Sequence, residues 1–122
     1  MDTHTEKQRS FNMSRIKSKW TRPEVVVHKF LIKNKIKHKM HPKINGHPDL
    51  ILKGTKTAIF VNGCFWHKCK KCFKWPKSNL AYWKPKIMGN VKRDRKNYKK
   101  LRKMGFEVII LWEHDIKRLL KQ

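Results

Sequence analysis

Three cysteines within nine residues constrain the fold of this chain more than any other feature of its sequence. Cys64, Cys69 and Cys72 lie in the segment GCFWHKCKKC. The last two have the C-x-x-C spacing with which two thiolates bind one tetrahedral zinc ion. Three clustered cysteines do not make a disulfide framework, so we expect metal-binding thiols rather than ordinary free thiols. A fourth ligand must come from elsewhere, and the candidates are His67, in the same segment, and His114.

Hydrophobic periodicity predicts one α/β domain around this segment, with a small mixed sheet flanked by helices. The predicted elements are a helix over residues 21–34, strands over 36–41, 47–52 and 57–61, an irregular loop over 62–85 with a short helix at 79–83, a helix over 90–104, a buried strand over 107–112 and a closing helix over 116–120. The first helix opens with the spacing of a capping box, and the second and third strands pair as an antiparallel hairpin. Residues 1–19 are predicted to be a basic arm, and residues 20–122 the single domain.

Net charge indicates the class of partner. The chain has 32 Lys and Arg against 8 Asp and Glu, a formal charge of +24. Such a field favours a polyanion, and nucleic acid is the default. Five tryptophans and 39% hydrophobic residues are not the composition of a solvated tail. No apolar run approaches the roughly 18 residues of a membrane span, and the first residues lack the pattern of a secretion signal. We therefore expect a soluble protein of the cell interior, present as a monomer.

Among the few carboxylates, Asp49 is the most informative. It follows Pro48 at the start of a buried strand, where many Mg²⁺-dependent nucleases place a metal-binding carboxylate, although turn chemistry alone also explains a Pro-Asp pair. The neighbouring strand lacks an acid-x-Lys triplet, so any metal would be held by Asp49 with backbone carbonyls, waters and phosphate. His67 is the candidate acid or base, because imidazole titrates near neutral pH. A surface histidine and a zinc ligand are the alternatives for His67.

Aromatic residues interleaved with lysine fill the same loop. They are Phe65, Trp66, Phe73, Trp75, Tyr82 and Trp83, and the lysines among them include Lys70 and Lys71. This pattern favours side chains that stack on bases or wedge into a duplex, with lysines on the phosphates. A small second core around the zinc ion is the alternative.

Several of these segments together resemble the very-short-patch repair (Vsr) endonucleases. The matching segments, within roughly residues 10–116, are Asn12-Met13, Glu24, Pro48-Asp49, FVNGCFWH at 60–67, Tyr82-Trp83 with Lys86, NVKRD at 90–94, Gly105-Phe106 and Leu111-Trp112-Glu113. The resemblance implies a restriction-endonuclease-like fold with one structural zinc ion. It also implies Mg²⁺-dependent cleavage of one strand of bacterial DNA, on the 5′ side of the T in a T:G mismatch left by deamination of methylcytosine.

The resemblance also implies roles for individual residues. Asp49 corresponds to the catalytic Mg²⁺ ligand, with the carbonyl of Val61 beside it, and His67 to the catalytic histidine. The remaining correspondences are Glu24 and Asp94 as assisting acids, Cys64, Cys69, Cys72 and His114 as zinc ligands, Phe65, Trp66 and Trp83 as aromatics that enter the duplex, and Met13 as an arm residue that contacts the opposite groove.

Two features depart from the family pattern. Asn62 stands where the family usually has histidine, and one residue is inserted between the second and third zinc ligands. An amide can hydrogen-bond a phosphate or a water but cannot move a proton at neutral pH. A weakly active or non-catalytic DNA-binding zinc protein, or a related nuclease directed at foreign DNA, is therefore an alternative function.

Overall fold

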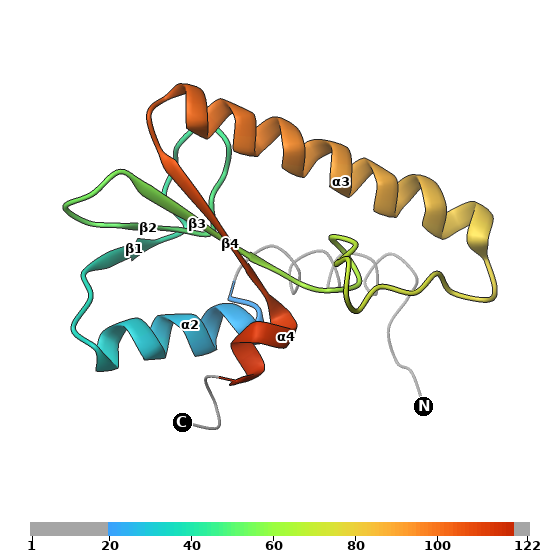
Figure 1. Cartoon of the computed structure of the whole chain (residues 1–122), viewed down its shortest axis with the longest axis horizontal. Helices are drawn as coiled ribbons and strands as arrows, with labels where there is room; N and C mark the ends of the chain where they lie inside the picture. Colours follow the sequence, from blue (N-terminus) through green and yellow to red (C-terminus); the bar gives the residue numbers. More distant parts are fainter. Residues whose placement is uncertain (1–19, 119–122) are drawn as a thin grey trace, which may run out of the picture.

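The computed structural model describes residues 20–118 and places them around one four-stranded sheet (Figure 1). The strands are β1 (His38–Met40), β2 (Leu50–Leu52), β3 (Thr57–Asn62) and β4 (Glu107–Trp112), in the spatial order β1-β2-β3-β4. β2 is antiparallel to both β1 and β3, whereas β3 and β4 are parallel. A parallel pair needs a long crossover connection. Here the crossover contains the loop after β3 and helix α3 (Leu80–Lys103).

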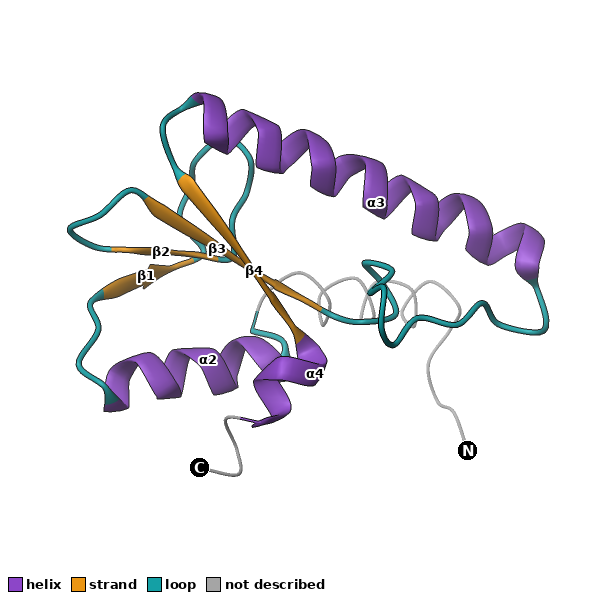
Figure 2. Ribbon diagram, in the orientation of Figure 1, coloured by secondary structure: helices purple, strands orange, loops and turns teal. Residues whose placement is uncertain are grey.

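Helices cover both faces of the sheet (Figure 2). Helix α2 (Arg22–Lys33) and the short helix α4 (Glu113–Ile116) lie on one face, and α3 lies on the other. The α2 face buries Val27, Leu31, Leu50, Ile59, Val61 and Ile116. The α3 face buries Ala58, Phe60 and Leu101. Consecutive residues of β3 thus alternate between the two cores, as strand geometry requires.

The helix predicted over residues 21–34 and the predicted hairpin are confirmed. Thr21 caps α2, with its side chain 3.4 Å from the backbone N–H of Glu24, and the Glu24 carboxylate accepts the Thr21 N–H at 3.0 Å. This is the predicted capping box. In the hairpin, Leu50 pairs with Ile59. Gly54 takes a φ of +86° in the turn, which glycine adopts without strain.

The predicted start of the second long helix is wrong. An irregular segment to residue 85, with only a short helix at 79–83, and a separate helix from residue 90 were expected. One continuous helix of 24 residues instead begins at Leu80 and includes both predicted helices. Pro85 and Gly89 suggested a break, because proline removes a helical hydrogen bond and glycine costs entropy. However, Trp83, Ile87 and Val91 recur every four residues, and Ile87 is fully buried. Packing of this face outweighs both local penalties.

Two details at the C-terminal side also differ. Strand β4 was expected to be buried, but it is an edge strand with no neighbour on one side among residues 20–118, and its residues are exposed or partly buried. The closing helix begins at Glu113 rather than at residue 116. The predicted arm, with Met13, lies outside the described residues. No helix within residues 20–118 is both long and apolar enough to cross a membrane.

Candidate metal site and active site

A four-ligand metal site forms where the loop after β3 meets the first turn of α4. The Nδ1 atom of His114 lies 3.3 Å from the Sγ of Cys64, 3.5 Å from that of Cys69 and 3.4 Å from that of Cys72. Zn–N and Zn–S bonds of about 2.1 and 2.3 Å in a tetrahedron place nitrogen and sulfur about 3.6 Å apart. The near-equal distances therefore fit one zinc ion. Within residues 20–118, no other group of three or more such ligands was found.

Parallel pairing of β3 and β4 brings these ligands together. The two strands end side by side at the pair Asn62↔Trp112, so the cysteine loop and α4 leave the sheet at the same edge. The N–H of Cys64 donates to the Glu113 carboxylate at 3.3 Å. Of the two candidates for fourth ligand, the structure thus brings His114 to the thiols. Its Nε2 lies 3.4 Å from a carboxylate oxygen of Asp115, the kind of partner that orients a ligating histidine.

Two carboxylates face each other at the same edge of the sheet. Glu24 is 2% exposed, and its Oε2 lies 3.2 Å from Nε2 of His41. Asp49 accepts the backbone N–H of Val61 at 2.6 Å and lies within hydrogen-bonding reach of Glu24. Burial, helped by the charges of Glu24 and Asp94 and opposed by the Val61 N–H, raises the pKa of Asp49 to about 8. Two neighbouring carboxylates, one of them held partly protonated when no cation is present, are a donor set that suits a hard divalent cation such as Mg²⁺.

We expect this raised pKa to appear as a pH dependence of stability. The folded state holds the Asp49 proton more tightly than the unfolded chain, whose pKa is near 3.8. This contribution is complete below pH 3.8 and is lost as pH rises towards 8. Asp49→Asn replaces the carboxyl group with an amide that stays neutral at every pH, so the variant does not lose this stability as pH rises. The variant should therefore melt at least about 5 °C above wild type at pH 8 in magnesium-free buffer, with a much smaller gap at pH 5. Parallel melting profiles between pH 5 and pH 8 would contradict the expectation.

His67 and Asp94 form a second pair close to the carboxylates. Nδ1 of His67 lies 2.6 Å from a carboxylate oxygen of Asp94, which α3 presents to the loop. Their side chains are 29% and 15% exposed. A carboxylate next to Nδ1 favours the imidazole tautomer in which Nδ1 is protonated. Nε2 then has the free lone pair that can accept a proton. Nε2 has no hydrogen-bond partner among residues 20–118, so it is available to a substrate.

Asn62 lies beneath this site rather than on its surface. Its side chain is 1% exposed and donates from Nδ2 to the hydroxyl oxygen of Tyr98 at 2.8 Å. Tyr98 also packs edge-on against Phe60, with ring centroids 4.7 Å apart. Tyr98 was not among the predicted site residues. The available signal was its position four residues after Asp94, which places both side chains on one face of a helix.

The three aromatic residues predicted to enter DNA form one cluster. Phe65 stacks on Trp66 with centroids 5.3 Å apart, and Trp83 contacts both at 5.3 and 5.7 Å. All three are partly buried. Asn90 donates to the Trp66 carbonyl at 3.0 Å and so fixes the loop against α3. The cluster is therefore held in place beside the candidate active site, with part of its surface facing solvent.

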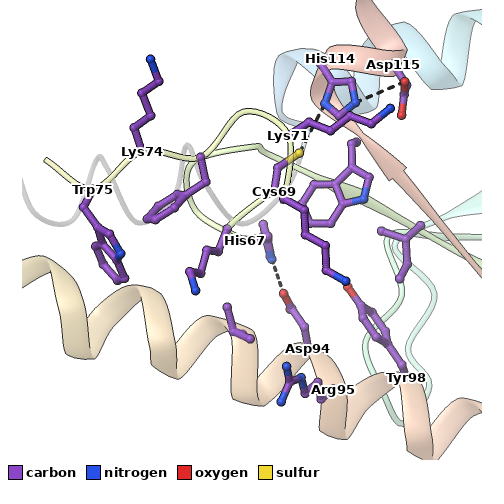
Figure 3. Close-up of a pocket in the computed structure, with 16 residues that line it drawn as sticks. His67, Cys69, Lys71, Lys74, Trp75, Asp94, Arg95, Tyr98, His114 and Asp115 are labelled. Atoms are coloured by element: carbon purple, nitrogen blue, oxygen red, sulfur yellow. Dashed lines mark hydrogen bonds and ion pairs between the residues drawn. The ribbon is translucent and has the colours of Figure 1, made fainter.

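A cavity of about 990 Å³ lies beside the candidate metal site, and Cys69 and His114 of that site line it (Figure 3). Its lining includes both His67 and Asp94, joined by their contact, and Tyr98. The basic residues on its walls are Lys68, Lys70, Lys71, Lys74 and Arg95. A positively charged cavity with an imidazole and a carboxylate inside it is suited to bind and hydrolyse a phosphodiester. The fold and the site thus define a nuclease.

Comparison with known proteins agrees with this class. The sequence profile of the family described as DNA mismatch endonuclease Vsr matches residues 1–74, more than half of the chain. Over 119 residues the chain is 44% identical to the type II nicking enzyme V.NmeAIP of Neisseria meningitidis serogroup A, with 95% of this chain and 84% of that protein covered. It is 34% identical to the type II nicking enzyme V.XorIIP of Xanthomonas oryzae pv. oryzae, with 97% and 88% covered. It is 33% identical to the DNA mismatch endonuclease Vsr of Escherichia coli K12, with 92% and 73% covered.

The chain therefore belongs to the Vsr family of DNA mismatch endonucleases. It is a DNA endonuclease with a restriction-endonuclease-like fold, and its Cys₃His group can bind a metal such as zinc.

Proposed function

We propose that this protein nicks one strand of double-stranded DNA at a T:G mismatch in a Mg²⁺-dependent reaction. It acts as a monomer on the DNA of a bacterial cytoplasm. The observation that carries the proposal is the convergence of two pairs, Asp49 with Glu24 and His67 with Asp94, at one sheet edge. Membership of the Vsr family and the name of the Escherichia coli relative support the mismatch as the target.

Each side chain of the site has a distinct role in this proposal. Asp49, with the backbone carbonyl of Val61, would hold the magnesium ion, which supplies positive charge to the phosphate oxygens. Glu24 keeps Asp49 in place through their contact. Nε2 of His67 accepts a proton from the attacking water, and Asp94 stabilises the imidazolium that results.

DNA recognition rests on a separate group of residues. Phe65, Trp66 and Trp83 insert beside the mismatch, where bases are poorly stacked and insertion costs less than in paired DNA. Lys70 and Lys71, both exposed on the cavity wall, contact phosphates. Met13, in the arm that precedes the described residues, contacts the opposite groove.

A nicking assay tests the proposal directly. Labelled duplexes with a T:G or a T:A pair in otherwise identical sequence are incubated with and without Mg²⁺, and magnesium is omitted rather than chelated so that the zinc site stays loaded. We expect one cut strand, only with T:G and only with Mg²⁺. Tight binding without any cut would favour the non-catalytic alternative that the replacement of histidine by Asn62 suggests. Cleavage that ignores the mismatch would favour restriction of foreign DNA.

The recognition roles predict opposite effects for two substitutions. Trp66→Ala should lower the preference for T:G over T:A duplex binding about tenfold and leave the salt dependence of binding unchanged, because the ring contributes stacking and no charge. Replacing Lys70 and Lys71 together with Gln should reduce the salt slope by about 2 and leave the preference intact. Both quantities come from fluorescence anisotropy titrations. If Trp66→Ala releases zinc while the folded fraction keeps its preference, Trp66 is a core residue and not a wedge.

A further inference from the structure

Tyr98 is a polar group at the candidate active site that the proposed function does not use. It stands on α3 one helical turn after Asp94, and both residues line the cavity that contains His67 (Figure 3). The electrostatic influence of both Asp94 and Asp49 reaches its hydroxyl. Tyr98 is therefore within the field of the two carboxylates on which the proposed reaction depends.

The hydrogen bond from Asn62 determines whether the hydroxyl of Tyr98 acts as a donor or as an acceptor. The amide nitrogen of Asn62 can only donate, so at 2.8 Å it occupies a lone pair of the Tyr98 oxygen. The phenolic O–H is then left to donate to another acceptor. Among residues 20–118, no acceptor for this proton is found. An oxygen of a bound substrate can supply it.

Two further observations make Tyr98 a donor suited to phosphate. Burial raises the pKa of Tyr98 to about 12, so the hydroxyl keeps its proton at every working pH. Its ring is held by Phe60 and its oxygen by the fully buried Asn62, so the donor is oriented before the substrate arrives. A neutral, pre-oriented donor in a basic cavity matches a non-bridging phosphate oxygen, which is a strong acceptor.

We propose that Tyr98 donates a hydrogen bond to a non-bridging oxygen of the scissile phosphate and that Asn62 is the residue that positions it. The inference rests on the proposed nicking function and deepens it, because it names a substrate contact. It also gives Asn62 a role that needs no proton transfer.

Tyr98→Phe tests the contact, because it removes one oxygen and keeps the ring that packs on Phe60. We expect the single-turnover nicking rate on saturating T:G duplex to fall 10- to 100-fold, with the duplex Kd changed less than threefold. Thr55→Val is the control, since it also removes one hydroxyl but from an exposed residue in the turn between β2 and β3, where that hydroxyl donates to Thr57 at 3.0 Å. It should nick at the wild-type rate. An unchanged rate for Tyr98→Phe, with wild type active, would overturn the inference.

A double variant separates a substrate contact from a structural role. Tyr98→Phe leaves the buried amide of Asn62 without its partner, which by itself destabilises the fold. Tyr98→Phe combined with Asn62→Leu removes that amide too, so melting temperature should recover while the nicking rate stays low. If the double variant nicks at the wild-type rate, Tyr98 serves only to satisfy Asn62 and the inference is wrong.

A binding measurement keeps the inference testable without cleavage. The phosphate on the 5′ side of the mismatched T is replaced by each methylphosphonate diastereomer, which deletes one non-bridging oxygen. One diastereomer should weaken wild-type binding about twofold more than it weakens binding by Tyr98→Phe, which has already lost the contact. Equal losses in both proteins would overturn the inference. If wild type does not nick but this difference appears, the proposed function fails and the phosphate contact stands.

Discussion

Asp49→Asn is expected to reduce nicking of a T:G duplex by at least about a thousandfold while DNA binding is retained or strengthened. The amide keeps an oxygen that can accept the Val61 N–H, which Asp49 now accepts at 2.6 Å, so the fold is preserved. It lacks the negative charge with which Asp49 would hold a divalent cation. Where Asp49 is ionised, towards and above pH 8, the substitution also removes a repulsion between this carboxylate and phosphate, which favours DNA binding. Single-turnover rates and anisotropy titrations on the same duplex measure the two effects.

Glu107→Gln is the matched control for this prediction. Glu107 is an exposed acid at the far end of β4, so its substitution removes the same charge away from the site. It should leave the nicking rate within about twofold of wild type. Full nicking by Asp49→Asn would remove Asp49 from the reaction, and equal losses in both variants would mean that net charge alone matters.

Loss of one zinc ligand is the second large effect that we expect. Cys69 is 2% exposed and His114 contacts all three thiols, so Cys69→Ser or His114→Ala leaves an incomplete site in a loop without strands or long helices. Zinc binding contributes directly to folding free energy in small domains. Either variant should bind less than half of the wild-type zinc and melt at least about 10 °C lower. Metal content by atomic emission and thermal melting measure both.

Histidine substitutions elsewhere provide the controls for the zinc prediction. His67→Ala should keep zinc and lose only a few degrees of melting temperature, because His67 contacts Asp94 and not the thiols. His47→Ala, at an exposed position, should change neither quantity. If His67→Ala strips the zinc instead, the separation of a metal site from a catalytic site is incorrect.

The sequence by itself was sufficient to predict the elements that depend on residues close together in the chain. The Thr21–Glu24 capping box and the hairpin around Gly54 were predicted correctly, because a cap and a tight turn depend on residues three or four apart. The C-x-x-C pair and its neighbour Cys64 also indicated a metal site, since three of the four ligands are close in the chain. The family and the candidate residues followed from motifs of the same short range.

Features that depend on contacts between distant segments of the chain were decided by the tertiary structure. The residues alone left His67 and His114 both open as the fourth ligand, and only the family resemblance indicated His114. The parallel pairing of β3 with β4 supplies the physical reason, because it brings α4 to the cysteine loop. The continuous α3 was missed because Pro85 and Gly89 are local signals of a break, whereas the burial of Ile87 that compensates for them is a long-range contact. The same helix places Tyr98 against Asn62, 36 residues away in sequence. Such contacts form only when the sheet and helix pack together, so no pattern of neighbouring residues encodes them.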